Sequence, residues 1–226
     1  MADEEDPMER ELFAASIARP RDSARYVAAL EIAVRTRLDD PEVDRHPDLE
    51  RVCLELAREY QVLKRWEDAL VAADAVAELE PDMQPDARCL RAEILMRMGR
   101  VAEAEPIWAA VRTETPDDVW LYYRAGMEYA AIGDHQTALD WLNEGVRVAL
   151  RTDGPDAEDP LTDELAELRQ AALDNLGRPA DELQEQAMTF LREKDEQERA
   201  EARREASEMF GLEPDRRPIR PTKRRH

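Results

Sequence analysis

Residues 126–142 read GMEYAAIGDHQTALDWL, and two stretches upstream follow the same pattern. They are AREYQVLKRWEDALVAA at residues 57–73 and AEILMRMGRVAEAEPIW at residues 92–108. The start of the pattern moves by 35 residues from Ala57 to Ala92, and by 34 residues from there to Gly126. Recurrence at a nearly fixed period predicts a structural unit that is repeated along the middle of the chain.

Each unit divides into two amphipathic helices joined by a tight turn. In the first unit, Leu56, Tyr60 and Leu63 share one helical face, as the i, i+4, i+7 spacing requires. Small residues recur inside both helices, where they allow the paired helices to approach closely. These small residues are Ala57, Ala92 and Gly126 in the first helices and Ala69, Ala104 and Ala138 in the second. The turn position, which suits a left-handed cap, holds Lys64, Gly99 and Gly133.

The pattern of these units resembles the tetratricopeptide repeat (TPR). It consists of a small residue, an aromatic or apolar residue three positions later, a turn glycine, an alanine and a closing proline. Three units match it, at residues 50–84, 85–118 and 119–152; the first has Lys64 for the turn glycine, and the third lacks the closing proline. More loosely, residues 97–120 are similar to actinobacterial TPR proteins of unknown function. The resemblance implies an all-α fold, an α-solenoid of TPR-like helical hairpins.

The flanks of the repeat predict further helices. Residues 1–49 are expected to form a divergent N-terminal hairpin, and residues 153–210 a C-terminal helical pair. The last helix is predicted to start at Pro179 and is charged on all sides beyond Lys194, so we expect it to extend into solvent. Three roles remain open for it: a solvated end, a docking helix for a partner, and a cover over the concave face.

Charge restricts the partners. The 226 residues carry 53 acidic and 32 basic side chains, for a net charge of −21. Residues 211–226 are predicted to be a disordered tail whose last part is basic. Because the acidic body repels phosphate, nucleic acid or a ribosome is a possible partner only through this tail. The tail residues concerned are Arg216, Arg217, Arg220, Lys223, Arg224 and Arg225.

The remaining composition favours a cytoplasmic protein without catalytic chemistry. No apolar run reaches the length of a membrane span, and the acidic start of the chain does not resemble a secretory signal. Phosphate-binding loops, metal-binding motifs and nucleophile motifs are missing from the sequence, so we expect no enzyme activity, no cofactor and no metal. Cys53 and Cys89 fall on successive first helices, too far apart for a disulfide, and are predicted to be free thiols.

The resemblance implies a concave groove, lined by the first helix of each unit, that binds a peptide or a segment of another protein. Trp120, Tyr123, Met96 and Met127 are expected to be apolar anchors, while arginines meet acidic groups on the ligand. The full set of expected groove residues is Arg51, Leu54, Arg58, Cys89, Glu93, Met96, Trp120, Tyr123, Arg124 and Met127. The family's carboxylate clamp for chaperone tails needs Lys and Asn where this chain has Leu54 and Arg58, so a heat-shock co-chaperone is not expected. Docking of a basic partner on the acidic outer surface is a further alternative.

Overall fold

The computed structural model describes residues 11, 14–16, 22–39, 49–79, 83–152 and 161–210, and all regular structure in these ranges is helical. The expectation of an all-α fold is therefore confirmed. The helices are α2 (Ser23–Asp39), α3 (Leu49–Val62), α4 (Trp66–Leu79), α5 (Arg88–Arg97), α6 (Val101–Glu114), α7 (Val119–Ala131), α8 (His135–Thr152), α9 (Thr162–Asn175) and α10 (Glu182–Phe210).

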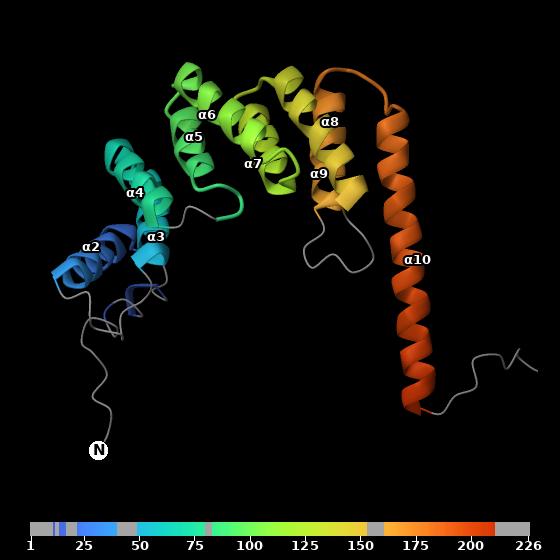
Figure 1. Ribbon diagram of the computed structural model, residues 1–226, viewed down its shortest axis with the longest axis horizontal. Coiled ribbons are helices and arrows are strands. Elements are labelled where there is room, and N and C mark those ends of the chain that lie inside the picture. Colours follow the sequence, from blue (N-terminus) through green and yellow to red (C-terminus); the bar gives the residue numbers. More distant parts are fainter. Residues whose placement is uncertain are drawn as a thin grey trace, which may run out of the picture.

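The helices form antiparallel hairpins that stack in chain order (Figure 1). The hairpins are α3/α4, α5/α6 and α7/α8, and α9 follows with the start of α10. Each hairpin packs on its neighbours, since α2 contacts α3, α4 contacts α5, and α8 contacts α9. The first helices α5, α7 and α9 also contact one another in series. This serial packing is the arrangement of an α-solenoid, in which every hairpin buries its apolar side against the next.

The same turn closes all four hairpins. Lys64, Gly99, Gly133 and Gly177 occupy the turn position, with φ angles of 57°, 77°, 83° and 65°. In each turn the following amide donates a hydrogen bond to a carbonyl five residues earlier, which is the Schellman pattern for ending a helix. These N···O distances are 2.8 Å for Arg65–Tyr60, 2.8 Å for Arg100–Leu95, 3.0 Å for Asp134–Tyr129 and 2.9 Å for Arg178–Leu173. The C-terminal pair therefore uses the turn of the central units, although its sequence is less similar.

Glycines bring the helices of the third hairpin into close contact. A Cβ added to Gly126 would lie 2.6 Å from Cγ of Leu142, and one added to Gly145 would lie 2.8 Å from Cβ of Tyr122. The prediction that a small residue lets these helices approach is confirmed at Gly126. The adjoining core is fully closed, since Leu142 and Trp108 are both 0% exposed.

The last helix starts later than predicted. It begins at Glu182, because the side chain of Asp181 accepts a hydrogen bond from the amide of Gln184 (3.1 Å) and caps the first turn. Arg169 of α9, only 1% exposed, fixes this end through Asp181 (2.6 Å), Gln184 (3.0 Å) and Asn143 of α8 (2.8 Å). Beyond residue 195 most side chains of α10 are exposed, and the helix extends away from the stacked hairpins (Figure 1).

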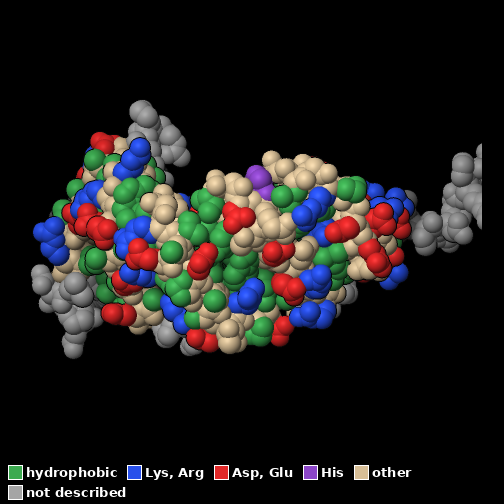
Figure 2. Space-filling view, turned by 90° about the horizontal axis from the view of Figure 1, so that it is seen from above, with side chains coloured by type: hydrophobic (Ala, Val, Ile, Leu, Met, Phe, Trp, Pro, Cys, Tyr) green, Lys and Arg blue, Asp and Glu red, His purple; other side chains and the backbone are tan. Residues whose placement is uncertain are grey.

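Acidic and basic side chains are interspersed over the face of the body that Figure 2 shows. None of the described helices is sufficiently long and apolar to span a lipid bilayer. The predicted basic tail, the loop before α3 and most of the first predicted N-terminal helix lie outside the described residues.

Candidate functional site

A cavity of about 200 Å³ opens among α3, α5, α7 and the loop that precedes α5. Its lining includes six of the residues expected in the groove: Leu54, Arg58, Cys89, Glu93, Trp120 and Arg124. These side chains come from three successive first helices, which the repeat aligns side by side. The structure thus brings residues that are up to 70 positions apart, from Leu54 to Arg124, around one hollow.

An aromatic pair stands at one side of this cavity. The rings of Trp120 and Tyr123 meet edge to face, with centroids 5.9 Å apart and an interplanar angle of 87°. Asp118 caps α7 by accepting a hydrogen bond from the amide of Trp120 (3.0 Å). The cap fixes the first turn of the helix and with it the position of the Trp120 side chain. Both rings are half-buried, so part of each remains accessible to a ligand.

A second hollow adjoins the first through Trp120. It has a volume of about 470 Å³ and is lined by Gln84, Trp120 and the turn at residues 115–119. Because Gln84 and Trp120 line both hollows, the indole lies between them. The two hollows together offer a surface longer than a single side chain, as a bound peptide segment requires.

Arg124 is occupied by a buried partner inside the protein. Its guanidinium donates to both carboxylate oxygens of Glu93, at 2.6 and 3.0 Å, and Glu93 is only 2% exposed. Burial raises the pKa of Glu93, and the positive charge of Arg124 opposes that rise. The expectation that Arg124 is available to acidic groups of a ligand therefore needs correction, because a carboxylate buried in the wall requires this arginine.

A parallel ion pair fixes the next turn of the same helices. Arg97 of α5 binds the buried Glu128 of α7 at 2.5 Å and donates to Oε1 of Gln61 of α3 at 2.7 Å. Sequence reasoning missed this network. The signal was present: Glu93 and Arg124 are 31 residues apart, and so are Arg97 and Glu128. When a glutamate and an arginine recur twice at the same 31-residue spacing, the recurrence indicates ion pairs between neighbouring first helices.

The remaining predicted residues divide by exposure. Leu54 and Met127 are half-buried, and Arg51 and Arg58 are exposed, with Arg58 paired to Glu55 one turn earlier (3.2 Å). Met96, in contrast, is 1% exposed, so its assignment as an anchor was wrong.

Burial of Met96 and Cys89 has a common cause. Both residues are 1% exposed and belong to the core that α5 forms with the helices around it. Cys89 and Cys53 are both free thiols, as predicted. Burial raises the pKa of both thiols.

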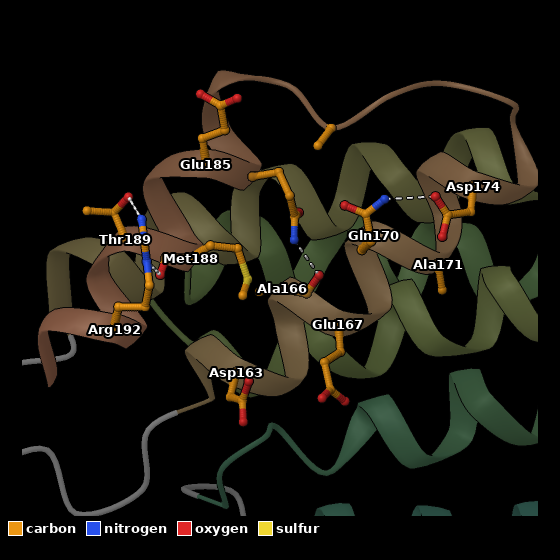
Figure 3. Close-up of a pocket in the computed structure, with 12 residues that line it drawn as sticks. Asp163, Ala166, Glu167, Gln170, Ala171, Asp174, Glu185, Met188, Thr189 and Arg192 are labelled. Atoms are coloured by element: carbon orange, nitrogen blue, oxygen red, sulfur yellow. Dashed lines mark hydrogen bonds between the residues drawn. The ribbon is translucent and has the colours of Figure 1, made fainter. Parts of the chain in front are cut away.

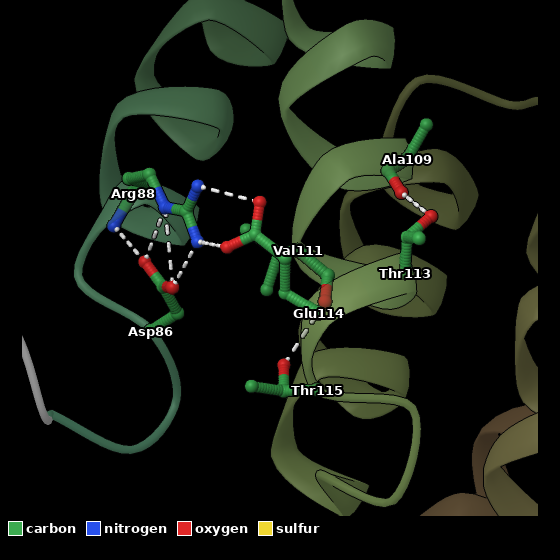
Figure 4. Close-up of polar contacts among 7 residues, drawn as sticks. All are labelled: Asp86, Arg88, Ala109, Val111, Thr113, Glu114 and Thr115. Carbon is green, nitrogen blue, oxygen red and sulfur yellow. Dashed lines mark hydrogen bonds and ion pairs between the residues drawn. The ribbon is translucent and has the colours of Figure 1, made fainter.

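The loop that borders the cavity is held by a charged triad (Figure 4). Arg88 binds Asp86 at 2.6 Å and Glu114 at the end of α6 at 2.5 Å. Hydrogen bonds from Arg88 lower the pKa of Asp86. These contacts connect the beginning of α5 to the end of α6 and so position Gln84 and its neighbours beside the aromatic pair.

The side chains that commonly ligate metal ions are not clustered in the part of the chain that the structure describes. Over the described ranges, the His, Cys, Asp and Glu side chains form no group able to hold a metal ion. The predicted tail site, Arg216 to Arg225, lies outside the residues that the structure describes.

Comparison with known proteins adds little to the description above. The chain matches no protein-family model, and no curated protein matches it in sequence. Solved structures of MamA align with most of the chain. The crystal structure of MamA is 14% identical with a TM-score of 0.47, covering 87% of this chain and 97% of that chain. Residues 41 to the end of MamA from Desulfovibrio magneticus RS-1 are 16% identical with a TM-score of 0.45, covering 84% and 98%. At these values the likeness carries no argument about binding.

Proposed function

We propose that this protein is a non-catalytic adaptor, which binds a peptide or a segment of another protein in the concave groove of its helical repeat. The observation that carries the proposal is the accessible edge-to-face pair of Trp120 and Tyr123 beside two connected hollows. Aromatic residues that stay partly accessible beside a cavity are typical of binding hot spots, because they bury a large area at little cost in conformational entropy.

The wall behind the aromatic pair supports a binding role because ion pairs hold its helices together. Glu93–Arg124 and Arg97–Glu128, whose carboxylates are buried, connect α5 to α7. A groove whose shape is set before the ligand arrives loses less entropy on binding. Arg51 and Arg58 remain exposed on α3, where an acidic group of the ligand meets Arg51 directly and competes with Glu55 for Arg58.

Mutation of the aromatic pair tests the proposal. The partner is first identified by affinity capture from the source cell and then purified. Binding is measured with the unmodified chain, with a Trp120→Ala/Tyr123→Ala variant, and with a control variant Val71→Ala/Leu79→Ala. The control removes two exposed apolar side chains of α4, which are 70% and 42% exposed and lie outside both hollows.

The expected result is a loss of at least about 2 kcal/mol of binding free energy for the aromatic variant and little change for the control. Circular dichroism must show the same helix content in all three proteins. If the aromatic variant binds as tightly as the unmodified chain, the groove is not the binding site. If the control loses binding instead, the outer face of α4 is the interface.

A further inference from the structure

A cavity between α9 and α10 has a volume of about 700 Å³, which is larger than either hollow beside Trp120 (Figure 3). Its apolar surface includes Ala166 and Ala171 of α9 and Met188 of α10, whose side chain is 46% exposed. The α9 residues that line it point away from Leu165, the residue that packs on Gly145 of α8. This α9/α10 groove therefore lies at the open end of the stack, where a solenoid would place its next element.

The α9/α10 groove is acidic. Four exposed carboxylates line it, namely Asp163, Glu167, Asp174 and Glu185. Within residues 161–210 and the other described ranges, no ion pair reaches any of the four. The only arginine in the lining, Arg192, donates instead to its own helix, at the carbonyl of Met188 (3.2 Å) and the hydroxyl of Thr189 (3.0 Å).

Neutralisation differs between this groove and the rest of the stack. In the central hairpins most carboxylates beside a cavity have an arginine partner, as Glu93 has Arg124 and Asp86 has Arg88. The α9/α10 groove, in contrast, combines an apolar surface with four carboxylates that have no arginine partner among the described residues. Such a surface fits a basic segment that carries an apolar side chain.

The chain itself contains a segment with that chemistry. Residues 216–226 read RRPIRPTKRRH, with six basic side chains, no acidic one, and Ile219 as the apolar residue. Pro218 and Pro221 favour an extended backbone, which suits a shallow groove between two helices.

The distances allow this segment to return to the groove. Glu185 precedes the end of α10 at Phe210 by 25 residues, which is about 37 Å along the helix axis. An extended chain advances about 3.1 Å per residue, so Lys223 reaches about 40 Å from Phe210. This is the greatest distance that Lys223 can reach along α10, because some residues are needed to reverse the chain, and it equals the level of Glu185. By the same arithmetic Ile219 reaches about 28 Å, which is the level of Arg192 and about 5 Å short of Met188.

We infer that residues 216–226 bind in the α9/α10 groove of their own chain, with Ile219 at the end of the groove that Arg192 lines, and with Arg220 and Lys223 directed toward the four carboxylates. The tail then runs antiparallel to α10 and covers the open end of the stack. This inference concerns a different surface from the concave groove and does not depend on the proposed adaptor function.

Zero-length carbodiimide cross-linking of the full chain tests the inference directly. The sequence contains only three lysines, Lys64, Lys194 and Lys223, so cross-linked peptides are easily assigned by mass spectrometry. At low micromolar protein concentration, Lys223 should be linked to Asp174, Glu167 or Glu185 in the monomer band. Links from Lys223 only to carboxylates of α10 beyond Asp195, or no links at all, would overturn the inference. Links that occur only in a dimer band would assign the groove to the tail of a second copy and overturn binding within one chain.

A second readout uses matched charge variants of the full chain. Glu167→Gln/Glu185→Gln removes two carboxylates of the groove, and Glu196→Gln/Glu205→Gln removes two from the exposed part of α10. Tryptic cleavage after Lys223 should become about tenfold faster in the first variant, which corresponds to about 1.4 kcal/mol of lost docking free energy. The second variant should be cleaved at the rate of the unmodified chain. Equal rates in all three proteins would contradict docking in the groove.

Discussion

A single methyl group at Gly126 should destabilise the protein, although alanine is the better helix former. The Gly126→Ala substitution places a Cβ 2.6 Å from Cγ and 2.7 Å from Cδ2 of Leu142. Non-bonded carbons prefer about 3.5–4.0 Å, and Leu142 is 0% exposed, so it has no free space to move into. The cost of overpacking is about 1–3 kcal/mol, while the gain in helix propensity is about 1 kcal/mol. Contacts of 2.6 and 2.7 Å call for the upper part of the overpacking range, about 2–3 kcal/mol, so we expect a net loss of about 1–2 kcal/mol in the free energy of unfolding.

Urea unfolding followed by far-ultraviolet circular dichroism measures this loss. A Leu142→Ala variant provides the control, because it removes the atoms that the new methyl group meets. Alone it should cost about 2–5 kcal/mol. The double variant Gly126→Ala/Leu142→Ala should lose less stability than the sum of the losses of the two single variants, by about 1 kcal/mol or more. The reason is that the new methyl group enters the space that Leu142 has vacated. The reasoning is refuted if Gly126→Ala is as stable as the unmodified chain, or if the two losses are additive.

Three further predictions concern buried charges and thiols. Arg124→Met should lower the free energy of unfolding by roughly 3–5 kcal/mol, because it leaves a buried carboxylate unpaired; a loss below about 1 kcal/mol in urea unfolding would contradict the pairing. A hydrogen bond from Arg169 lowers the pKa of Asp181, so its stabilising effect is present above the unfolded pKa and is lost as the pH falls. The unmodified chain should therefore be more stable than Asp181→Asn at neutral pH, and the difference should shrink as the pH falls through the lowered pKa of Asp181; thermal unfolding that differs equally at neutral and acid pH would exclude this. Finally, Cys53 and Cys89 should not react with Ellman's reagent at pH 8 until the chain is unfolded, and rapid native labelling would disprove their burial.

Local rules were sufficient to predict the fold because each hairpin repeats them. Small residues such as Gly126 mark where helices touch, and Gly99 and Gly133 mark where they turn. Even Lys64, which departs from the pattern, adopts the same positive φ of 57°, because the surrounding helices impose the turn. The first residue of the last helix was predicted less well, since the cap by Asp181 depends on the contact with Arg169 from a preceding helix.

The groove was harder to predict than the fold. Repeat position alone placed Met96 on the surface, but burial depends on how closely α5 packs against its neighbours, which the repeat pattern does not determine. The partner of Arg124 was missed for a similar reason. An arginine on a first helix looks available to a ligand until the neighbouring helix is known to present a buried glutamate. The α9/α10 groove was not predicted because it forms between a weakly similar hairpin and the beginning of a long helix.

Photo-cross-linking at a chosen position tests the concave binding site most directly. A benzoylphenylalanine residue is introduced at Tyr123, whose ring contacts Trp120 of the hollows, or at Val71, which is 70% exposed on α4. After irradiation with the purified partner, the account predicts a covalent complex from position 123 and none from position 71. A complex formed from position 71 alone, or equally from both, would contradict binding in the groove.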